Sequence, residues 1–271
     1  MRIEELVFDT AFKLRQSGIE SAKFEAKQMV AAASRDKMSF EKVTDGEVES
    51  VRQMLLRRQQ NEPLQYILGE WEFYGLPFKV GEGVLIPRSD TETLVSAVLK
   101  LRPEGKKVFD LCAGSGCIGI TLAKLGNAEV TMFEKSPKAL KYLKENIELN
   151  GVTAAVKECD VLCEVAAEKV DFIVSNPPYI ATEVIDTLSA EVKKEPKMAL
   201  DGGEDGLLFY RHIAKEWKSA LNDGGHLVFE IGFDQAEAVM NILTDEGFSD
   251  IQCIKDLCLN DRVVLGTYKI S

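Results

Sequence analysis

From Lys107 onward the chain alternates short apolar runs with stretches of helical spacing, and this alternation constrains its fold more than any other feature. Short runs rich in β-branched and apolar residues are typical of strands buried on both faces of a parallel sheet, and helices connect such strands. The expected strands are 107–111, 129–133, 154–158, 171–175 and 225–230, with two further apolar stretches at 251–254 and 262–268. The pattern therefore predicts an α/β domain with a doubly wound sheet.

The residues before this alternation carry two other patterns. Over residues 1–62, apolar side chains recur at helical spacing and predict three amphipathic helices that form a small N-terminal helical domain. Over residues 63–88, aromatic and β-branched residues are broken by turn residues, which predicts a β-hairpin linker. The remaining residues, 89–271, are expected to form the sheet domain, which opens with a helix over 91–101.

Charge and hydropathy indicate in which compartment the chain works and which kinds of partner it binds. A net charge of -11 argues against a broad nucleic-acid surface, because phosphate contacts recruit Lys and Arg. No apolar stretch approaches the roughly 20 residues that span a bilayer. The start, Met1–Glu5, is acidic where a signal peptide is basic. We therefore expect a cytoplasmic protein without membrane contact or stable nucleic-acid binding, whose partner is a protein or a small molecule.

The six cysteines and two histidines do not follow a metal-binding pattern. No two cysteines have the C-x-x-C spacing, and a zinc site would have to combine cysteines from separate elements. We expect free thiols in a reducing compartment and no metal site.

The tetrapeptide Asn176-Pro177-Pro178-Tyr179 directly follows the predicted strand 171–175 and is the clearest indication of chemistry in the chain. Ligands of open α/β folds bind at the carboxyl ends of the strands. The amide oxygen of Asn176 and the carbonyl of Pro177 can each accept a hydrogen from a planar NH2 group, while the prolines fix the loop. Tyr179 can pack its ring on that group. The alternative is a proline-stiffened turn in which Tyr179 fills a gap in the core.

The complete tetrapeptide after a buried strand is typical of methyltransferases that act on planar nitrogen, namely adenine N6, guanine N2 or the side-chain amide of glutamine. An amide nitrogen is a weak nucleophile because its lone pair is delocalised into the carbonyl. Accepting both N–H hydrogens orients the nitrogen toward the methyl donor and stabilises the positive charge that develops on it. The methylated nitrogen can lose its proton to water, so no strong base is needed at the motif.

A glycine-rich turn after the strand 107–111 indicates a cofactor site. Without side chains at Gly114 and Gly116, the backbone can approach a cofactor closely and adopt positive φ, and the following helix supplies free N–H donors. With Gly119 the glycines match G-x-G-x-x-G, and Glu134 lies 20 residues after Gly114, so a dinucleotide site fits as well. The turn residues expected to contact the cofactor are Cys112, Ala113, Gly114, Ser115 and Gly116.

Acidic residues at the ends of the first three predicted strands separate these two kinds of cofactor. Asp110 can pair with the ammonium group of a methionine moiety, whereas it would repel a pyrophosphate. Glu134 can bond ribose hydroxyls in either cofactor. Asp160 can accept a hydrogen bond from an adenine amino group, with the backbone of Val161 beside it; a solvated loop aspartate is the alternative. With Asn176, these acids favour S-adenosyl-L-methionine, whose product is S-adenosyl-L-homocysteine, over a nicotinamide dinucleotide.

The chain resembles the peptide chain release factor glutamine methyltransferases of the HemK/PrmC family over almost its whole length. Besides Asn176–Tyr179, the resemblance lies in Pro63–Gly69, Leu85–Glu92, Glu195-Pro196, Ala199–Gly206, Phe209–Arg211, Glu230–Gly232 and Asp261-Arg262. Such segments are not shared by methyltransferases at large. The resemblance implies a seven-stranded, Rossmann-like class I methyltransferase domain whose last strand is antiparallel, preceded by a small helical bundle.

By that resemblance, the substrate is the glutamine of the Gly-Gly-Gln loop in bacterial release factors, methylated at its side-chain N5, and the helical domain binds the release factor. The residues expected to border the glutamine pocket are Leu85, Pro87, Arg88 and Glu92. A proline turn followed by an ordinary salt bridge is the alternative for them. The chain departs from the family at Cys112-Ala113, where Gly-Thr is common, and at Glu134, where aspartate is common.

Three other functions stay open on the residues alone. A nucleic-acid methyltransferase acting on adenine N6 or guanine N2 would need the same tetrapeptide. The acidic total argues against it, since such enzymes use a basic surface and room for a flipped base. A dinucleotide-dependent oxidoreductase would match the glycines, and a non-catalytic binding protein would leave Asn176 without a role.

Overall fold

The computed structural model describes residues 1–35 and 37–269. The chain forms two compact units, Met1–Gly69 with Ala190–Lys194 and Glu70–Ser189 with Glu195–Ser271. The first unit extends beyond the expected boundary at residue 62. The reason is local: Leu64–Leu68 forms a short helix that packs on the helices before it instead of opening the hairpin.

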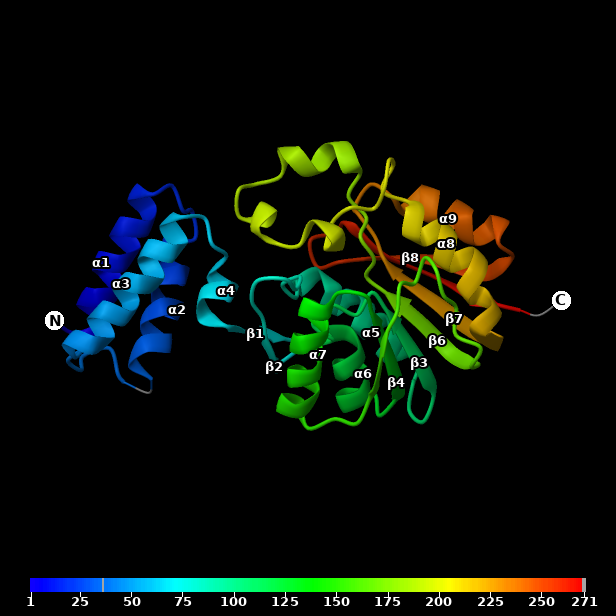
Figure 1. Cartoon of the computed structure of the whole chain (residues 1–271), viewed down its shortest axis with the longest axis horizontal. Helices are drawn as coiled ribbons and strands as arrows, with labels where there is room; N and C mark the ends of the chain where they lie inside the picture. The colour runs from blue at the N-terminus through cyan, green and yellow to red at the C-terminus, as the bar shows by residue number, and fades with distance from the viewer. Residues whose placement is uncertain (36, 270–271) are drawn as a thin grey trace. The chain divides into compact units, whose positions relative to one another are not determined.

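The first unit is built from helices α1 (Ile3–Gln16), α2 (Ala22–Ser34), α3 (Asp45–Gln59) and α4 (Leu64–Leu68) (Figure 1). The first three confirm the helices expected from apolar spacing. Their shared core is formed by Ile3, Leu6, Val30 and Val51. Helix α3 begins at a capping box: the Thr44 hydroxyl accepts from the Glu47 N–H, and the Glu47 carboxylate accepts from the Thr44 N–H.

A buried ion pair links α2 to the end of α3. The side chains of Glu25 and Arg58 are each 6% exposed, and Arg58 Nε lies 2.6 Å from Glu25 Oε2. Arg58 Nη2 also lies 2.7 Å from Oε2 of the partly exposed Glu191, which belongs to the same unit. Removing one partner of a buried pair leaves the other charge desolvated and uncompensated. The pairing therefore constrains how these helices pack.

The second unit opens with a β-hairpin of strands β1 (Glu70–Phe73) and β2 (Leu76–Lys79). Its two-residue turn is Tyr74-Gly75, with φ of 53° and 74°, as a type I′ turn requires. The strands occupy only the middle of the expected hairpin 63–88. Residues 80–88 form no strand, and 83–88 line the cavity described below.

Within the described residues, the centre of the second unit is a seven-stranded sheet of order β5-β4-β3-β6-β7-β9-β8. The strands are β3 (Lys107–Leu111), β4 (Glu129–Glu134), β5 (Ala155–Glu158), β6 (Val170–Ser175), β7 (Leu221–Glu230), β8 (Phe248–Lys255) and β9 (Asp261–Tyr268). Each lies where an apolar run predicted a strand. Strand β9 is antiparallel to β7 and β8, whereas the other pairings are parallel. The expected sheet with an antiparallel last strand is confirmed.

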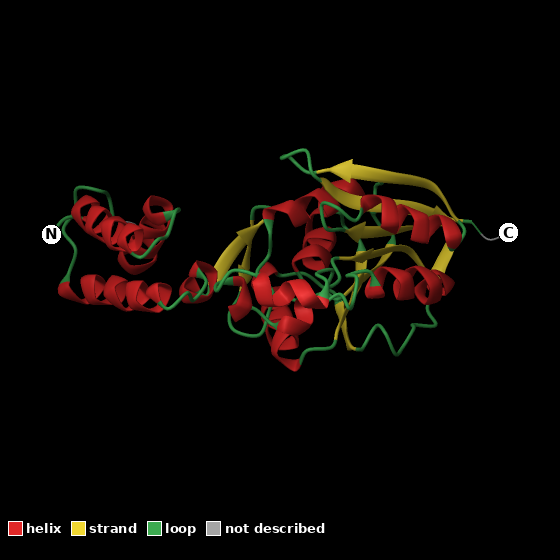
Figure 2. Cartoon of the chain, turned by 90° about the horizontal axis from the view of Figure 1, so that it is seen from above, coloured by secondary structure: helices red, strands yellow, loops and turns green. Residues whose placement is uncertain are grey.

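Helices cover both faces of this sheet (Figure 2). They are α5 (Glu92–Lys100), α6 (Cys117–Leu125), α7 (Pro137–Asn150), α8 (Leu208–Glu216) and α9 (Ala236–Asp245). Successive residues of β3 point to opposite layers: Val108 packs in the cluster with α5, α6 and α7, and Phe109 packs in the cluster with α8 and α9. Burial on both sides explains why the strand is apolar at consecutive positions.

The strand order reverses at β3, which pairs with β4 on one side and β6 on the other. At such a switch point, the loops leaving neighbouring parallel strands diverge and open a crevice at the carboxyl ends. Two of these loops begin at Cys112, after β3, and at Asn176, after β6. The topology therefore brings the glycine-rich turn and the tetrapeptide to the same edge of the sheet.

We expect Glu25→Ala to lower the free energy of unfolding by about 3 kcal/mol, because Arg58 would stay buried without its main partner. Denaturant unfolding of the full chain measures the change. Glu49→Ala is the matched control, since Glu49 pairs with Arg52 on the exposed side of α3 and should contribute no more than about 0.5 kcal/mol. Equal losses in the two variants would contradict a special role for the buried pair.

Candidate active site

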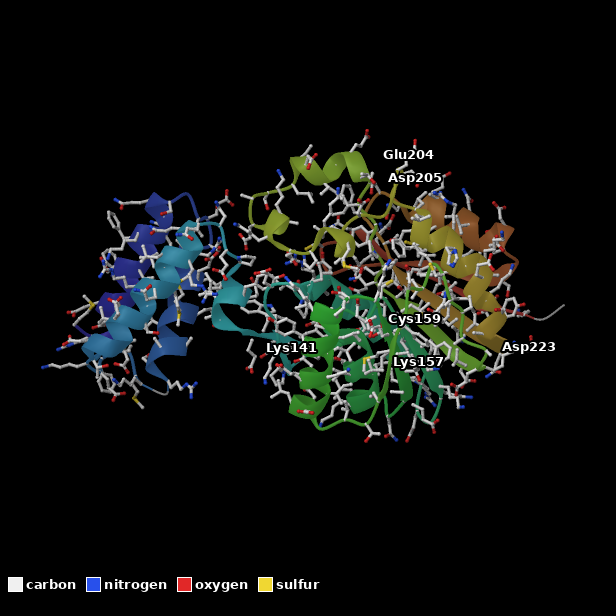
Figure 3. The ribbon with its side chains drawn as sticks, viewed as in Figure 1. Lys141, Lys157, Cys159, Glu204, Asp205 and Asp223 are labelled. Carbon is white, nitrogen blue, oxygen red and sulfur yellow. The ribbon has the colours of Figure 1, made fainter. Side chains whose placement is uncertain are left out.

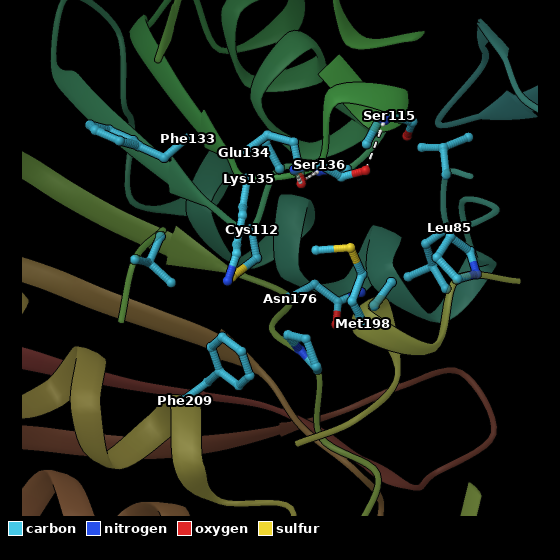
Figure 4. A pocket seen from close by; sticks show the side chains of 18 of the residues that line it. Leu85, Cys112, Ser115, Phe133, Glu134, Lys135, Ser136, Asn176, Met198 and Phe209 are labelled. Atoms are coloured by element: carbon cyan, nitrogen blue, oxygen red, sulfur yellow. Dashed lines mark hydrogen bonds between the residues drawn. The ribbon is translucent and has the colours of Figure 1, made fainter. Parts of the chain in front are cut away.

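A cavity of about 480 Å³ opens in the second unit at the carboxyl ends of β3, β4, β5 and β6 (Figure 4). Its wall also includes the segment 83–88 and residues that follow Glu195. The predicted site residues in this wall are Leu85, Pro87, Arg88, Cys112, Ala113, Gly114, Ser115, Glu134, Asp160, Val161, Asn176 and Pro178. The predicted residues outside it are Glu92, Asp110, Gly116, Pro177 and Tyr179.

The turn between β3 and α6 needs glycine at two positions. Gly114 has φ of 56°, and its N–H donates to Glu134 Oε2 at 2.8 Å. Gly116 caps helix α6 with φ of 81°, and a Cβ there would lie 2.9 Å from Cδ1 of Ile120. Side chains rarely adopt such φ values. Gly114 therefore presents backbone to the cavity, whereas Gly116 shapes the turn without lining it.

Cys112 also has a left-handed backbone, with φ of 61°. A non-glycine residue in this region costs on the order of 1 kcal/mol or more. This is the position at which the resembling family commonly has glycine, and the backbone conformation explains that preference. Burial holds the pKa of the Cys112 thiol well above its usual range, so the thiol is protonated and is no nucleophile.

Glu134 ends β4 and is 8% exposed, in the cavity wall. Its Oε2 accepts from the Gly114 N–H at 2.8 Å, and its Oε1 accepts from the Ser136 N–H at 2.7 Å. Burial raises the pKa of this carboxyl, and the backbone donors act in the opposite direction. Ser136 in turn caps α7 by accepting from the Ala139 N–H at 3.3 Å. Two turns thus hold the carboxylate in place.

Asp110 lies elsewhere than expected. It is fully buried outside the cavity wall, and its Oδ2 accepts from the Gly119 N–H at 2.9 Å. Its Oδ1 has no hydrogen-bond partner among the described residues. Burial raises the pKa of this carboxyl to about 7, against the opposing effect of the Gly119 bond. The side chain supports the first turn of α6 instead of facing the cavity as an ammonium partner would, because its strand position points it into the layer beneath the turn.

Asp160 lies in the cavity wall after β5, and both of its oxygens are engaged. Its Oδ2 lies 2.5 Å from Lys135 Nζ, and its Oδ1 accepts from the Leu162 N–H at 3.1 Å. The Lys135 bond lowers the pKa of this carboxyl. The neighbouring Val161 is buried, and its carbonyl accepts from the Trp217 indole at 2.9 Å. This loop offers an apolar surface with a carboxylate at its edge, which suits a purine ring.

The tetrapeptide after β6 is divided between the cavity and the core. Asn176 and Pro178 line the cavity, and Asn176 Nδ2 donates to Thr91 Oγ1 at 3.3 Å. Pro177 is buried, and Tyr179 packs against the core cluster of α8 and α9. The ring therefore occupies the place that the alternative interpretation assigned to it. We expected Tyr179 to pack on the substrate, but its position outside the cavity wall does not support that contact.

Three residues without a predicted role hold the tetrapeptide. Gln235 Nε2 donates to the Tyr179 carbonyl at 2.9 Å. A Cβ on Gly206 would lie 2.4 Å from the same carbonyl oxygen, and a Cβ on Gly202 would lie 2.7 Å from Tyr179 Cα. Glu204-Asp205 lies exposed between these glycines (Figure 3). Both glycines belong to segments that carried the family resemblance, whereas the sequence held no signal for Gln235.

Leu85, Pro87 and Arg88 lie in the wall, as the border of a substrate pocket requires. Glu195, which is 5% exposed, holds this segment: its Oε2 accepts from the Ile86 N–H at 3.0 Å, and its Oε1 pairs with Arg88. Glu195 was part of the resemblance but had no predicted role. Its partners lie more than 100 residues away in the chain, so only the fold could reveal it.

Glu92 was expected in the same border but faces the hairpin instead. Its Oε1 accepts from the Tyr74 N–H at 2.8 Å, and the Tyr74 hydroxyl lies 3.1 Å from Ser96 Oγ. Glu92 is the first residue of α5, so it ties that helix to the turn between β1 and β2. This structural contact corresponds to neither the pocket nor an ordinary surface salt bridge.

The charges of the wall suit S-adenosyl-L-methionine better than a dinucleotide. Its basic side chains within the described residues, Arg88 and Lys135, are paired with Glu195 and Asp160. A pyrophosphate would meet carboxylates there, whereas a sulfonium or an ammonium cation is favoured by them. The donor set therefore fits, with Glu134 suited to ribose hydroxyls and the loop after β5 suited to adenine.

Neither a metal site nor a membrane span is found in the described part of the chain. No group of three or more His, Cys, Asp or Glu side chains there could hold a metal ion, and no helix there is long and apolar enough to cross a bilayer. All six cysteines are free thiols.

We expect Glu134→Ala to weaken the binding of S-adenosyl-L-methionine about 10-fold or more, because hydrogen bonds to a charged group contribute on the order of 1.5–3 kcal/mol. The variant also removes the acceptor of the Gly114 N–H. Titration calorimetry measures the affinity. Glu129→Ala is the matched control at the exposed opposite end of β4 and should bind normally. Unchanged affinity in Glu134→Ala would overturn this assignment.

We expect the free energy of unfolding to fall as the pH rises from about 4 to about 7, in part through Asp110. Its folded pKa of about 7 lies above the unfolded value near 4. The folded state therefore keeps a proton that the unfolded chain releases, and this stabilisation is lost through that range. Asp110→Asn keeps an acceptor for Gly119 and should flatten the profile measured by denaturant unfolding. A slope as steep as in the control Glu129→Gln would refute it.

Comparison with protein-family models places both units. The model described as Methyltransferase small domain matches residues 89–222, and the PrmC N-terminal domain matches residues 5–69. Among solved structures, a methyltransferase from Pyrococcus furiosus is similar with a TM-score of 0.57 over 73% of this chain and 91% of that one, at 19% identity. A ribosomal protein L11 methylase from Lactobacillus delbrueckii subsp. bulgaricus gives 0.51 over 72% and 86%, at 20% identity. These two structures show the fold.

Two bacterial relatives are similar over more than nine tenths of the chain. The release factor glutamine methyltransferase of Clostridium botulinum is 40% identical over 97% of this chain and 98% of the relative. That of Geobacter sulfurreducens is 41% identical over 93% and 92%. With the geometry of the cavity, these similarities lead to one conclusion: the chain belongs to the release factor glutamine methyltransferase family.

Proposed function

We propose that this chain transfers the methyl group of S-adenosyl-L-methionine to the side-chain amide N5 of the glutamine in the Gly-Gly-Gln loop of peptide chain release factors. The proposal rests mainly on the position of Asn176. It lies in the cavity wall at the carboxyl end of β6, in the same cavity as Glu134 and the glycine-rich turn. A neutral amide at that place provides an acceptor for a planar NH2 group.

The chain's own residues orient the nitrogen. When bound, S-adenosyl-L-methionine supplies an electrophilic methyl group on a sulfonium. The Asn176 amide oxygen is suited to accept one hydrogen of the glutamine NH2, and we expect the backbone carbonyl of Pro177, a residue that is buried outside the wall, to accept the other. Those hydrogen bonds strengthen as positive charge develops on the nitrogen, so they stabilise the transition state more than the bound substrate.

The wall offers no strong base, and the reaction needs none. No histidine lines the cavity within the described residues, and Glu134 and Asp160 are engaged in hydrogen bonds of their own. The methylated nitrogen is acidic enough to release its proton to water. The surrounding carboxylates favour the cationic groups that take part.

We further propose that the helical domain, 1–62 in the sequence-based division, recognises the release factor, and that 63–88 and 89–271 act as linker and catalytic domain. Helix α1 exposes Phe8 and Phe12, one turn apart, with 75% and 54% of their surface accessible. Adjacent exposed aromatic residues are typical of protein-binding surfaces. The net charge of -11 favours a protein over stable nucleic-acid binding. Six free thiols suit the reducing cytoplasm.

We expect the protein to label a release factor with methyl-labelled S-adenosyl-L-methionine and to leave the same factor unlabelled when its loop glutamine is changed to alanine. Asn176→Ala should lower the turnover number on the order of 100-fold, because an acceptor that acts in the transition state is lost. Its cofactor affinity should change far less. Turnover comes from label incorporation and affinity from titration calorimetry.

Asn241→Ala supplies the matched control, since Asn241 is exposed on α9 and should leave turnover unchanged. Equal labelling of both release factors, or labelling of DNA or ribosomal RNA in their place, would refute the proposed substrate. Comparable losses of turnover and cofactor affinity in Asn176→Ala would refute the role of that amide.

A further inference from the structure

Glu230 is a buried carboxyl that the proposed methyl transfer does not use. It ends β7, is 1% exposed, and its Oε2 has no hydrogen-bond partner among the described residues. Burial raises the pKa of this carboxyl to about 7. An incompletely paired buried acid opposes folding, and such acids concentrate at functional sites. Its position therefore calls for a role.

A hydroxyl connects Glu230 to the methylation site. Thr91 closes the short 3-10 turn Ser89–Thr91 and is 2% exposed, in the cavity wall. Its Oγ1 accepts from Asn176 Nδ2 at 3.3 Å, and its side chain lies beside the Glu230 carboxyl, whose pKa it lowers. Strands β6 and β7 are neighbours, with Ser175 opposite Phe229, so Asn176 and Glu230 follow side by side at the strand ends.

The donor and acceptor atoms of these three groups determine the direction of each hydrogen bond between them. A carboxylate can only accept hydrogen bonds, and a hydroxyl has one hydrogen to donate. If Thr91 donates to ionised Glu230, its oxygen is left to accept from Asn176. The Asn176 NH2 must then face Thr91, which leaves the amide oxygen free for the substrate. If the hydroxyl instead donated toward Asn176, the amide could turn its NH2 toward the substrate NH2, and two donors would face each other.

We propose that Thr91 and Glu230 are positioning residues that hold the Asn176 amide with its oxygen toward the substrate nitrogen. This inference deepens the proposed function, because it presumes that Asn176 accepts a hydrogen from the glutamine amide. Neither residue touches the reacting atoms. Glu230 acts through Thr91, and Thr91 acts through Asn176.

Glu230, Thr91 and Asn176 form a chain of contacts that we call the relay. The charged groups around Glu230 allow this relay to respond to pH. Arg262 and Arg88 favour the ionised carboxyl, whereas Asp90 opposes it. Arg262 is held by Asp90, 3.4 Å from its Nη2, and by Asp256, 3.3 Å from its Nε, so it does not replace Thr91 as the partner of Glu230. The remaining titratable neighbours are Tyr179, Tyr210 and Cys117, whose pKa values are raised by burial. They stay neutral, so Glu230 is the one among these neighbouring groups that changes charge near pH 7.

Thr91→Val is the decisive variant, because it keeps the shape of the side chain and removes the hydroxyl. We expect its turnover number to fall about 10-fold, because one hydrogen bond that orients the Asn176 amide is lost. Its cofactor affinity should stay unchanged. Thr91→Ser restores the hydroxyl and should recover turnover to within about twofold of the wild type. Thr121→Val is the matched control: Thr121 is also buried, and within the described part of the chain its hydroxyl donates to the Cys117 carbonyl and does not contact Asn176.

Glu230→Gln tests the other end of the relay. In the wild type, the single-turnover rate should rise as Glu230 ionises near pH 7, and this step should be absent in Glu230→Gln. A rate that keeps the same pH dependence in Glu230→Gln, or Thr91→Val and Thr91→Ser impaired alike, would overturn the proposal.

The side-chain NH2 signals of Asn176 are assigned by their loss in Asn176→Ala. Nuclear magnetic resonance of this NH2 group tests the relay without measuring catalysis. Its signals should shift with the ionisation of Glu230 in the wild type and lose that shift in Thr91→Val. An equal shift in both would overturn the relay. A wild type that shows the shift but labels no release factor would refute the proposed function while leaving the relay in place.

Discussion

The pairing of β3 with β4 on one side and β6 on the other is the constraint on which the site depends. It sends the loops of neighbouring strands in opposite directions and opens the cavity between them. The glycine-rich turn and Asn176 meet there because both follow strands of this central group. The apolar layers on the two faces hold the strands, so the site is built on the most buried part of the second unit.

Buried carboxyl groups are a second feature that recurs around the site. Asp110, Glu134, Glu195 and Glu230 are each no more than 8% exposed. Burying an acid is unfavourable unless hydrogen bonds or charges compensate it. Asp110 and Glu134 receive backbone N–H donors, and Glu195 receives both a backbone N–H and Arg88. The hydrogen bonds of Asp110, Glu134 and Glu195 hold the segments that form the wall.

Much of the site was predictable from local pattern. Strands that are buried on both faces leave consecutive apolar residues, and glycines mark the turn that needs positive φ, as Gly114 and Gly116 show. The direction of a side chain at a strand end was less predictable. Asp110 and Tyr179 were expected at the cavity but lie in the layers beneath it, because the pleat of the strand and the packing of the core decide where each points.

The sequence by itself determined the fold class and the position of the tetrapeptide after a buried strand, and it led to the prediction that the tetrapeptide suits a planar nitrogen, since these follow from local periodicity and from the chemistry of adjacent residues. Only the tertiary structure decided the partners of those residues. Thr91 beside Asn176, Glu195 beside Arg88 and Gln235 on the Tyr179 carbonyl join segments 85, 107 and 56 residues apart. Contacts of that kind depend on how the strands are ordered and the loops packed, which no local pattern encodes.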